Sequence, residues 1–218
     1  MNELSKRVAK YYSKQGFKLF LYVIFFMITV AIAWGLVLFG DDYDWKRKLL
    51  SMLLGYYEWI VPYLIFYYSI YAPTWHDGVA MSMGVRRKDV FCGNLIKLGT
   101  YALCNALSEC LLILLSNQTE QMNRALFLMA ISLAAGSLGH FLGYKVYRYG
   151  KTFMIFSAIV FIVAYFVIRV SYAINHYGMA NNFLYERYIF VYILGSIILF
   201  GVMEMLIYKA NKKSVVIM

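Results

Sequence analysis

Five ionisable side chains interrupt the long apolar stretches of the sequence, and they are the groups best placed to do chemistry: Glu58, Glu109, His140, Arg169 and Glu204. A charge among hydrocarbon is costly, so such groups usually face protein or a water-filled path and pair with one another. At a helical rise of about 1.5 Å per residue, His140 and Glu204 each lie about 8 Å from the basic end of their segments. Glu58 and Arg169 lie near the opposite surface. The spacing predicts the pairs His140–Glu204 and Glu58–Arg169, and it leaves Glu109 nearer the middle of its segment.

Two interpretations of these five groups stay open. Some of them line a path for an amphipathic or cationic substrate, or they only form structural pairs. Glu109 is the strongest candidate for the path because the spacing gives it no partner.

The sequence has no catalytic or metal-binding pattern. It lacks HExxH, CxxC and paired carboxylates on one helix, and Cys92, Cys104 and Cys110 are predicted to be small buried hydrophobic residues. The tripeptide GKT at 150–152 resembles the end of a phosphate-binding loop, but Lys145 stands where that loop needs glycine. We therefore predict no catalytic residue, cofactor or metal site in this chain.

The composition indicates which solvent surrounds the elements that position these groups. The chain has 218 residues, of which 62% are hydrophobic and 15% charged, against about 25% charged in an ordinary soluble domain. One water-soluble core cannot bury so much apolar surface. The net charge of +10 comes from basic residues scattered between apolar runs, which favours basic loops of a membrane protein over nucleic-acid binding.

The sequence predicts an all-α integral membrane protein that forms a single transmembrane domain. A bilayer core of about 30 Å needs about 20 apolar residues in a helix. Six segments meet this requirement, approximately at 17–39, 53–72, 94–116, 125–144, 152–173 and 188–208.

The basic residues predict the orientation of these spans. Fifteen Lys and Arg residues flank one side of the predicted spans and six flank the other. Because basic flanks stay inside, both termini are expected in the cytoplasm, which requires an even number of spans. The basic and aromatic stretch Ser5–Lys18 is further expected to lie along the inner surface as an amphipathic helix, or to act only as a basic flank that fixes orientation.

A compact charged segment, "MSMGVRRKDVFCGNLIK" at 81–97, lies between the second and third predicted spans. The loop at 73–93 is longer than orientation requires and combines cations with Met and Phe, which suit contact with a soluble partner. The predicted docking residues are Met81, Met83, Gly84, Val85, Arg86, Arg87, Lys88, Asp89 and Phe91.

This loop resembles the corresponding loop of ABC-2-type transporter permeases, especially the small six-span bacterial subunits. The residues that match the family's order are Met83, Gly84, Val85, Arg87, Lys88, Phe91 and Gly93. Arg86 departs from the pattern, because the family commonly has Ser there. Exporters of amphipathic peptides such as phenol-soluble modulins are similar in layout.

The resemblance implies a permease subunit in the bacterial plasma membrane. The charged segment is then a coupling helix that docks into a separate ATPase subunit, present in two copies, which holds the ATP and Mg. The N-terminal stretch is then an elbow helix, and a second permease subunit, identical or a sister chain, completes the path. The alternative is a scaffold or sensor whose loop docks a signalling protein; a membrane enzyme is disfavoured because its motifs are missing.

Overall fold

The computed structural model describes residues 3–38, 45–82, 84–117, 122–150, 152 and 183–213. These residues form five long helices and, within the described ranges, no strand. The helices are α1 (Glu3–Leu38), α2 (Trp45–Ser82), α3 (Arg87–Leu115), α4 (Asn123–Tyr149) and α6 (Phe183–Lys213). Each is long and apolar enough to cross a membrane, which confirms the all-helical prediction and five of the predicted apolar segments. The predicted span at 152–173, which includes Arg169, lies outside the described residues apart from Thr152.

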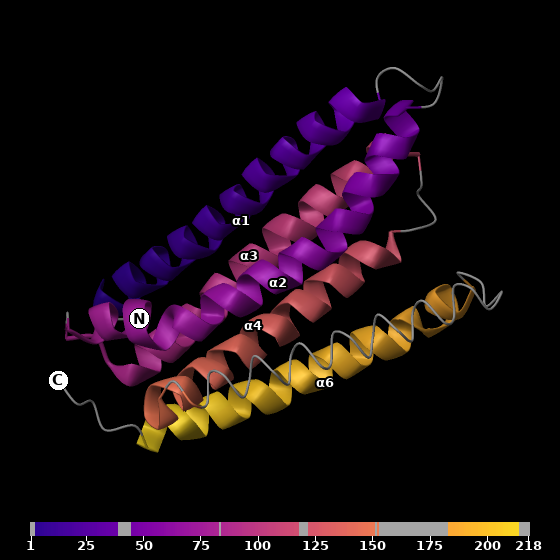
Figure 1. Cartoon of the computed structure of the whole chain (residues 1–218). Helices are drawn as coiled ribbons and strands as arrows, with labels where there is room; N and C mark the ends of the chain where they lie inside the picture. Colours follow the sequence, from indigo (N-terminus) through magenta and orange to yellow (C-terminus); the bar gives the residue numbers. More distant parts are fainter. Residues whose placement is uncertain are drawn as a thin grey trace.

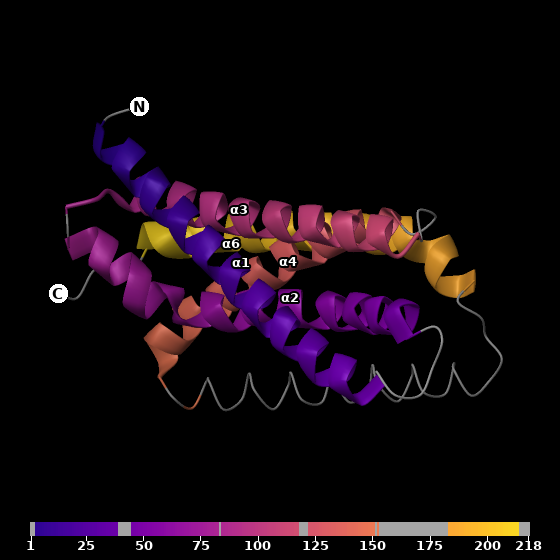
Figure 2. The same cartoon turned by 90° about the horizontal axis from the view of Figure 1, so that it is seen from above.

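The helices form an elongated bundle (Figure 1). The first four alternate in direction, and α6 runs in the same direction as α4. We call the end that holds the connection between α2 and α3 the tip end, and the opposite end, where α1 ends and α2 begins, the far end. α1 begins and α6 ends at the tip end (Figure 1). Viewed from above, α1 crosses α2 and α3 obliquely, and it packs against both (Figure 2).

The first helix is longer than the predicted span. α1 contains 36 residues and continues without a break through the basic stretch, so the prediction of a separate elbow helix on the membrane surface is wrong. The reason is packing, because Val8 and Tyr12 are buried against the ends of α2 and α3. Gly16 allows close approach, since a Cβ there would collide with the backbone oxygen of Lys97.

The prediction of a loop at 73–93 is wrong, because most of these residues belong to α2 and α3. α2 passes through Pro62 and Pro73 and ends at Ser82, and α3 already begins at Arg87. Proline removes a backbone donor, but neighbouring helices stabilise such a segment inside a bundle. Here Pro73 is buried, and it packs beside Gly143 of α4, where a side chain would collide with it.

The glycines of α4 allow this helix to pack closely against α2 and α3. A Cβ at Gly139 or Gly143 would collide with the backbone of α2, and one at Gly136 with the side chain of Leu98. The small residues of α4 therefore pack against helices of the same chain, because small residues let membrane helices approach closely.

Large apolar side chains cover the outside of the bundle. Phe25 and Leu36 of α1 are 73% and 77% exposed, and Leu107 and Leu111 form part of an exposed stripe on α3. α6 exposes most of its apolar residues as well. Soluble monomers rarely expose apolar patches of this extent, so the surface is compatible with lipid as the surrounding solvent.

Candidate functional site: a buried polar cluster beneath a basic turn

The connection between α2 and α3 is a tight turn. Gly84 has φ +77°, a conformation that favours glycine, and its N–H donates to the Met81 oxygen at 3.0 Å. Asp89 ties the turn together, because Oδ2 is 3.0 Å from Arg86 Nε and Oδ1 accepts a hydrogen bond from Ser5 Oγ at 3.0 Å. The turn is thereby joined to α1.

The predicted docking residues are divided between surface and interior. Gly84, Arg86 and Lys88 are exposed, and Met81, Arg87, Asp89 and Phe91 are partly buried. Val85 is buried against Val8, Tyr12, Ala80 and Val90, where Met81 also packs. The Phe91 ring makes an edge contact with Tyr208 of α6 at 5.5 Å between ring centroids. Met83 lies outside the described residues.

These positions correct two parts of the docking prediction. The segment is not a separate helix, because it consists of the last residues of α2, a turn and the first residues of α3. The predicted apolar face points into the bundle, where burial of Val85 and Val90 is more favourable than exposure. The surface that remains available at the tip is basic, and the Arg86 side chain is 70% exposed there.

Directly behind this turn, Asp77 is fully buried and joins four helices. Its Oδ1 accepts hydrogen bonds from the Tyr12 hydroxyl at 2.8 Å and from Asn94 Nδ2 at 2.9 Å. Its Oδ2 lies 3.1 Å from His140 Nε2 and 3.4 Å from the Tyr144 hydroxyl. A buried carboxylate is stable only with such a set of donors, so this contact fixes α1, α2, α3 and α4 relative to one another.

Lys97 extends the cluster on α3. Its Nζ donates to Asn94 Oδ1 at 2.8 Å and lies 6.0 Å and 5.5 Å from the ring centroids of Tyr12 and Tyr68. The ammonium is buried, and the aromatic faces and the nearby carboxylate of Asp77 replace its water. The Tyr68 hydroxyl in turn donates to Gln15 of α1 at 3.1 Å.

The predicted pair of His140 and Glu204 is wrong in detail. His140 binds Asp77, whereas Glu204 of α6 accepts a hydrogen bond from Ser137 Oγ at 2.6 Å. Ser137 lies one helical turn from His140, so this bond brings Glu204 of α6 next to the group around Asp77. The cluster therefore holds two carboxyl groups and two basic groups, and it includes all five described helices. We define the tip cluster as Tyr12, Asp77, Asn94, Lys97, Ser137, His140, Tyr144 and Glu204.

A second polar group lies at the far end. Glu58 Oε1 accepts from Arg124 Nε of α4 at 2.7 Å. The predicted partner Arg169 lies outside the described residues. The Tyr57 hydroxyl donates to Asn105 Oδ1 at 2.9 Å across α2 and α3.

Glu109 is 0% exposed, and neither of its carboxyl oxygens has a hydrogen-bond partner among the described residues. It lies six residues before Leu115, the last residue of α3, which is about 9 Å along the helix. The two charged groups that act on Glu109 are Glu58 and Arg124, so Glu109 belongs to the polar group at the far end.

Sequence reasoning omits Asp77, Asn94 and Lys97 from the site. The i, i+3 spacing of Asn94 and Lys97 places them on one helix face and is the available signal for that pair. Asp77 follows Pro73, which predicts the end of a helix, so the sequence assigns it to a loop instead of the interior.

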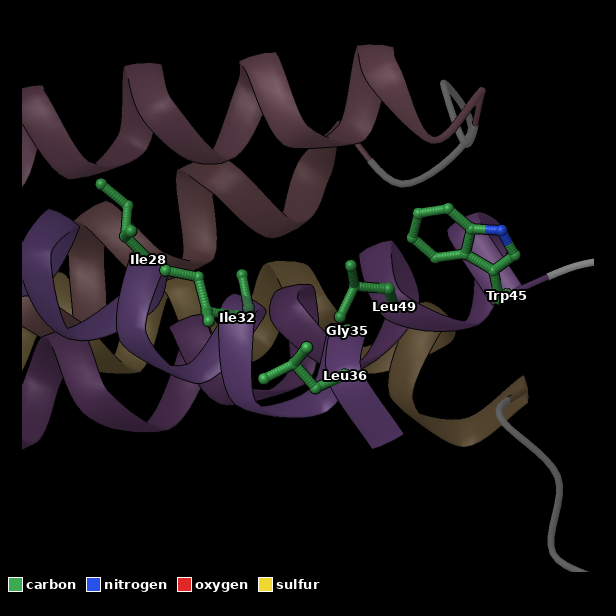
Figure 3. A pocket seen from close by; sticks show the side chains of 7 residues that line it. Ile28, Ile32, Gly35, Leu36, Trp45 and Leu49 are labelled. Atoms are coloured by element: carbon green, nitrogen blue, oxygen red, sulfur yellow. The ribbon is translucent and has the colours of Figure 1, made fainter. Parts of the chain in front are cut away.

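The far end also carries an apolar groove between α1 and α2, with a volume of about 560 Å³. Its lining contains only apolar side chains and one glycine, and the Trp45 ring stands at one end (Figure 3). The only polar side-chain atom among these lining residues is the indole N–H of Trp45. The described residues hold no group of three His, Cys, Asp or Glu side chains that could bind a metal ion.

Comparison with known proteins gives no relative, because no protein-family model, curated protein or solved structure matches this chain.

Proposed function

We propose that the chain is the permease subunit of an ATP-driven ABC exporter that moves an amphipathic substrate out of the cell. In this proposal the exposed basic turn at 84–88 docks on a separate ATPase subunit, which binds ATP and Mg. Two ATPase copies and a second permease subunit complete the transporter. The chain itself carries out no covalent chemistry.

The observation that supports this proposal best is the position of Asp77 directly behind the turn. A force applied at the turn acts on the ends of α2 and α3, and Asp77 joins those ends to α1 and α4 through buried hydrogen bonds. Packed interfaces of this kind shift between discrete arrangements and do not deform continuously. Docking at the turn is thus coupled to a rearrangement of the whole bundle.

The proposed topology has six spans with both termini in the cytoplasm of a bacterial cell. α4 and α6 run in the same direction (Figure 1), which requires the chain to return between them, and the apolar sequence at 152–173 is long enough for that crossing. The excess of basic residues at the tip end then places the turn in the cytoplasm. A cysteine introduced by Arg86→Cys should react with an impermeant maleimide only after the cells are opened.

The decisive experiment is copurification in mild detergent. The native chain should bring down a partner that hydrolyses MgATP, and Lys88→Glu should reduce this associated ATPase activity at least tenfold. The matched control is Lys46→Glu, which reverses an exposed charge at the far end and should leave the activity unchanged. Equal activity in both variants refutes docking at the turn. Recovery of the native chain with a signalling protein and no ATPase favours the scaffold or sensor function.

A further inference from the structure

Glu109 differs from the other buried ionisable groups of the bundle. Asp77, Lys97 and His140 each have at least one hydrogen bond inside the protein. Glu109 is equally buried, yet both of its oxygens lack a partner among the described residues. An isolated carboxylate in a dry interior is so unfavourable that it takes up a proton or binds a cation.

The neighbours of Glu109 do not supply that cation. Two charged groups act on it, Glu58 with the same sign and Arg124 with the opposite sign. Arg124 is engaged with Glu58 through a contact of 2.7 Å. Among the described residues, the buried group of Glu58, Glu109 and Arg124 therefore holds one guanidinium for two carboxyl groups.

The polar neighbours of Glu109 are also engaged elsewhere. The Tyr57 hydroxyl uses its hydrogen for Asn105, and the Asn105 amide donates to the backbone oxygen of Tyr101 at 2.9 Å. Ser108, the residue before Glu109, donates to the Cys104 oxygen at 3.1 Å. These bonds hold α2 and α3 in place around Glu109 without giving its carboxyl group a hydrogen-bond partner.

We propose that Glu109 is the binding site for a single organic cation, an ammonium or guanidinium group, which displaces the proton from this carboxyl. A single carboxylate suits such a group better than a metal ion, because the described residues around it provide no set of metal ligands. Binding places a positive charge beside the Glu109 carboxylate, and the proton leaves to solvent. That the cation belongs to a transported amphipathic molecule rests on the proposed permease function, but the binding itself does not.

The test uses dicyclohexylcarbodiimide on the purified full-length chain in lipid nanodiscs. A protonated carboxyl in apolar surroundings adds across a C=N bond of this reagent, its oxygen to carbon and its proton to nitrogen, and the adduct rearranges to a stable acylurea. Mass spectrometry should find the adduct on Glu109. Saturating dodecylamine, which is cationic at neutral pH, should slow labelling at least tenfold, whereas uncharged dodecanol of the same chain length should change it less than twofold.

Three substitutions, one of them a control, sharpen the test. Glu109→Gln should weaken dodecylamine binding at least tenfold, whereas Glu3→Gln, the same change at the opposite end of the bundle, should leave it unchanged. Glu58→Gln releases Arg124, which then pairs with Glu109, so labelling should fall at least tenfold even without dodecylamine. An unlabelled Glu109 in the native chain, or equal protection by dodecylamine and dodecanol, would overturn the proposal. Since no ATPase is present, the result is independent of whether the turn docks one.

Discussion

Removal of the Asp77 carboxylate should loosen the whole bundle. In Asp77→Ala, the Tyr12 hydroxyl, Asn94 Nδ2 and His140 Nε2 lose their acceptor, all within 3.1 Å in the native protein. A buried donor left without a partner costs about 1–3 kcal/mol in soluble proteins, and hydrogen bonds between membrane helices average about 0.6 kcal/mol. At about 1 kcal/mol per donor, Asp77→Ala costs about 3 kcal/mol, which corresponds to a fall in Tm of about 6–12 °C for a chain of this size.

The measurement is thermal unfolding of the purified protein in one detergent. Asp77→Asn keeps one acceptor oxygen and the same shape, so its loss should be about a third of that of Asp77→Ala. Ser69→Ala is the matched control on the same helix, because Ser69 is buried and its hydroxyl has no hydrogen-bond partner among the described residues. This change should leave Tm unchanged or raise it. If Asp77→Ala unfolds within 2 °C of Ser69→Ala, the tip cluster does not hold the helices together.

Three further predictions follow from the packing and the charges. Gly139→Ala should lower Tm because its Cβ meets backbone, whereas Gly195→Ala, which meets nothing within 4 Å, should leave Tm unchanged or raise it; equal shifts would contradict the close approach. Glu58→Gln and Arg124→Gln should each destabilise, and the double variant should cost less than their sum by about 0.5–3 kcal/mol; strict additivity would exclude the pair. On the proposed permease function, Glu109→Gln should lower export of a cationic amphipathic peptide by the reconstituted complex while the complex stays assembled; unchanged export by a normally expressed variant would remove this residue from the proposed path.

The sequence predicts the helices well because lipid imposes a simple requirement, a long run of apolar residues. The segments around Val23, Ile113 and Leu128 all fulfil it, and each is helical in the structure. The residues at which the helices begin and end are less predictable. Pro73 normally ends a helix, but here the close approach of Gly143 stabilises the segment and the helix continues to Ser82.

Pairing between helices is harder to predict than the helices themselves. The estimated depth of each residue in the bilayer correctly places Glu58 at the far end and His140 at the tip end. Depth alone does not give the rotation of each helix about its own axis. Among the described residues, Arg124 is the partner of Glu58, and Asp77 takes the place of Glu204 as the partner of His140. Burial of Glu109 without a partner among the described residues likewise depends on which face of α3 meets α2, which one sequence does not specify.

The unbroken first helix has a consequence for the choice of membrane. With 36 residues, α1 is about 54 Å long, whereas the hydrocarbon layer measures about 30 Å. Because α1 is longer than the hydrocarbon layer, it fits thicker or thinner bilayers by changing its tilt or by shifting along its axis. Each Å of mismatch costs a fraction of a kcal/mol. The fold should therefore tolerate wide variation in acyl-chain length.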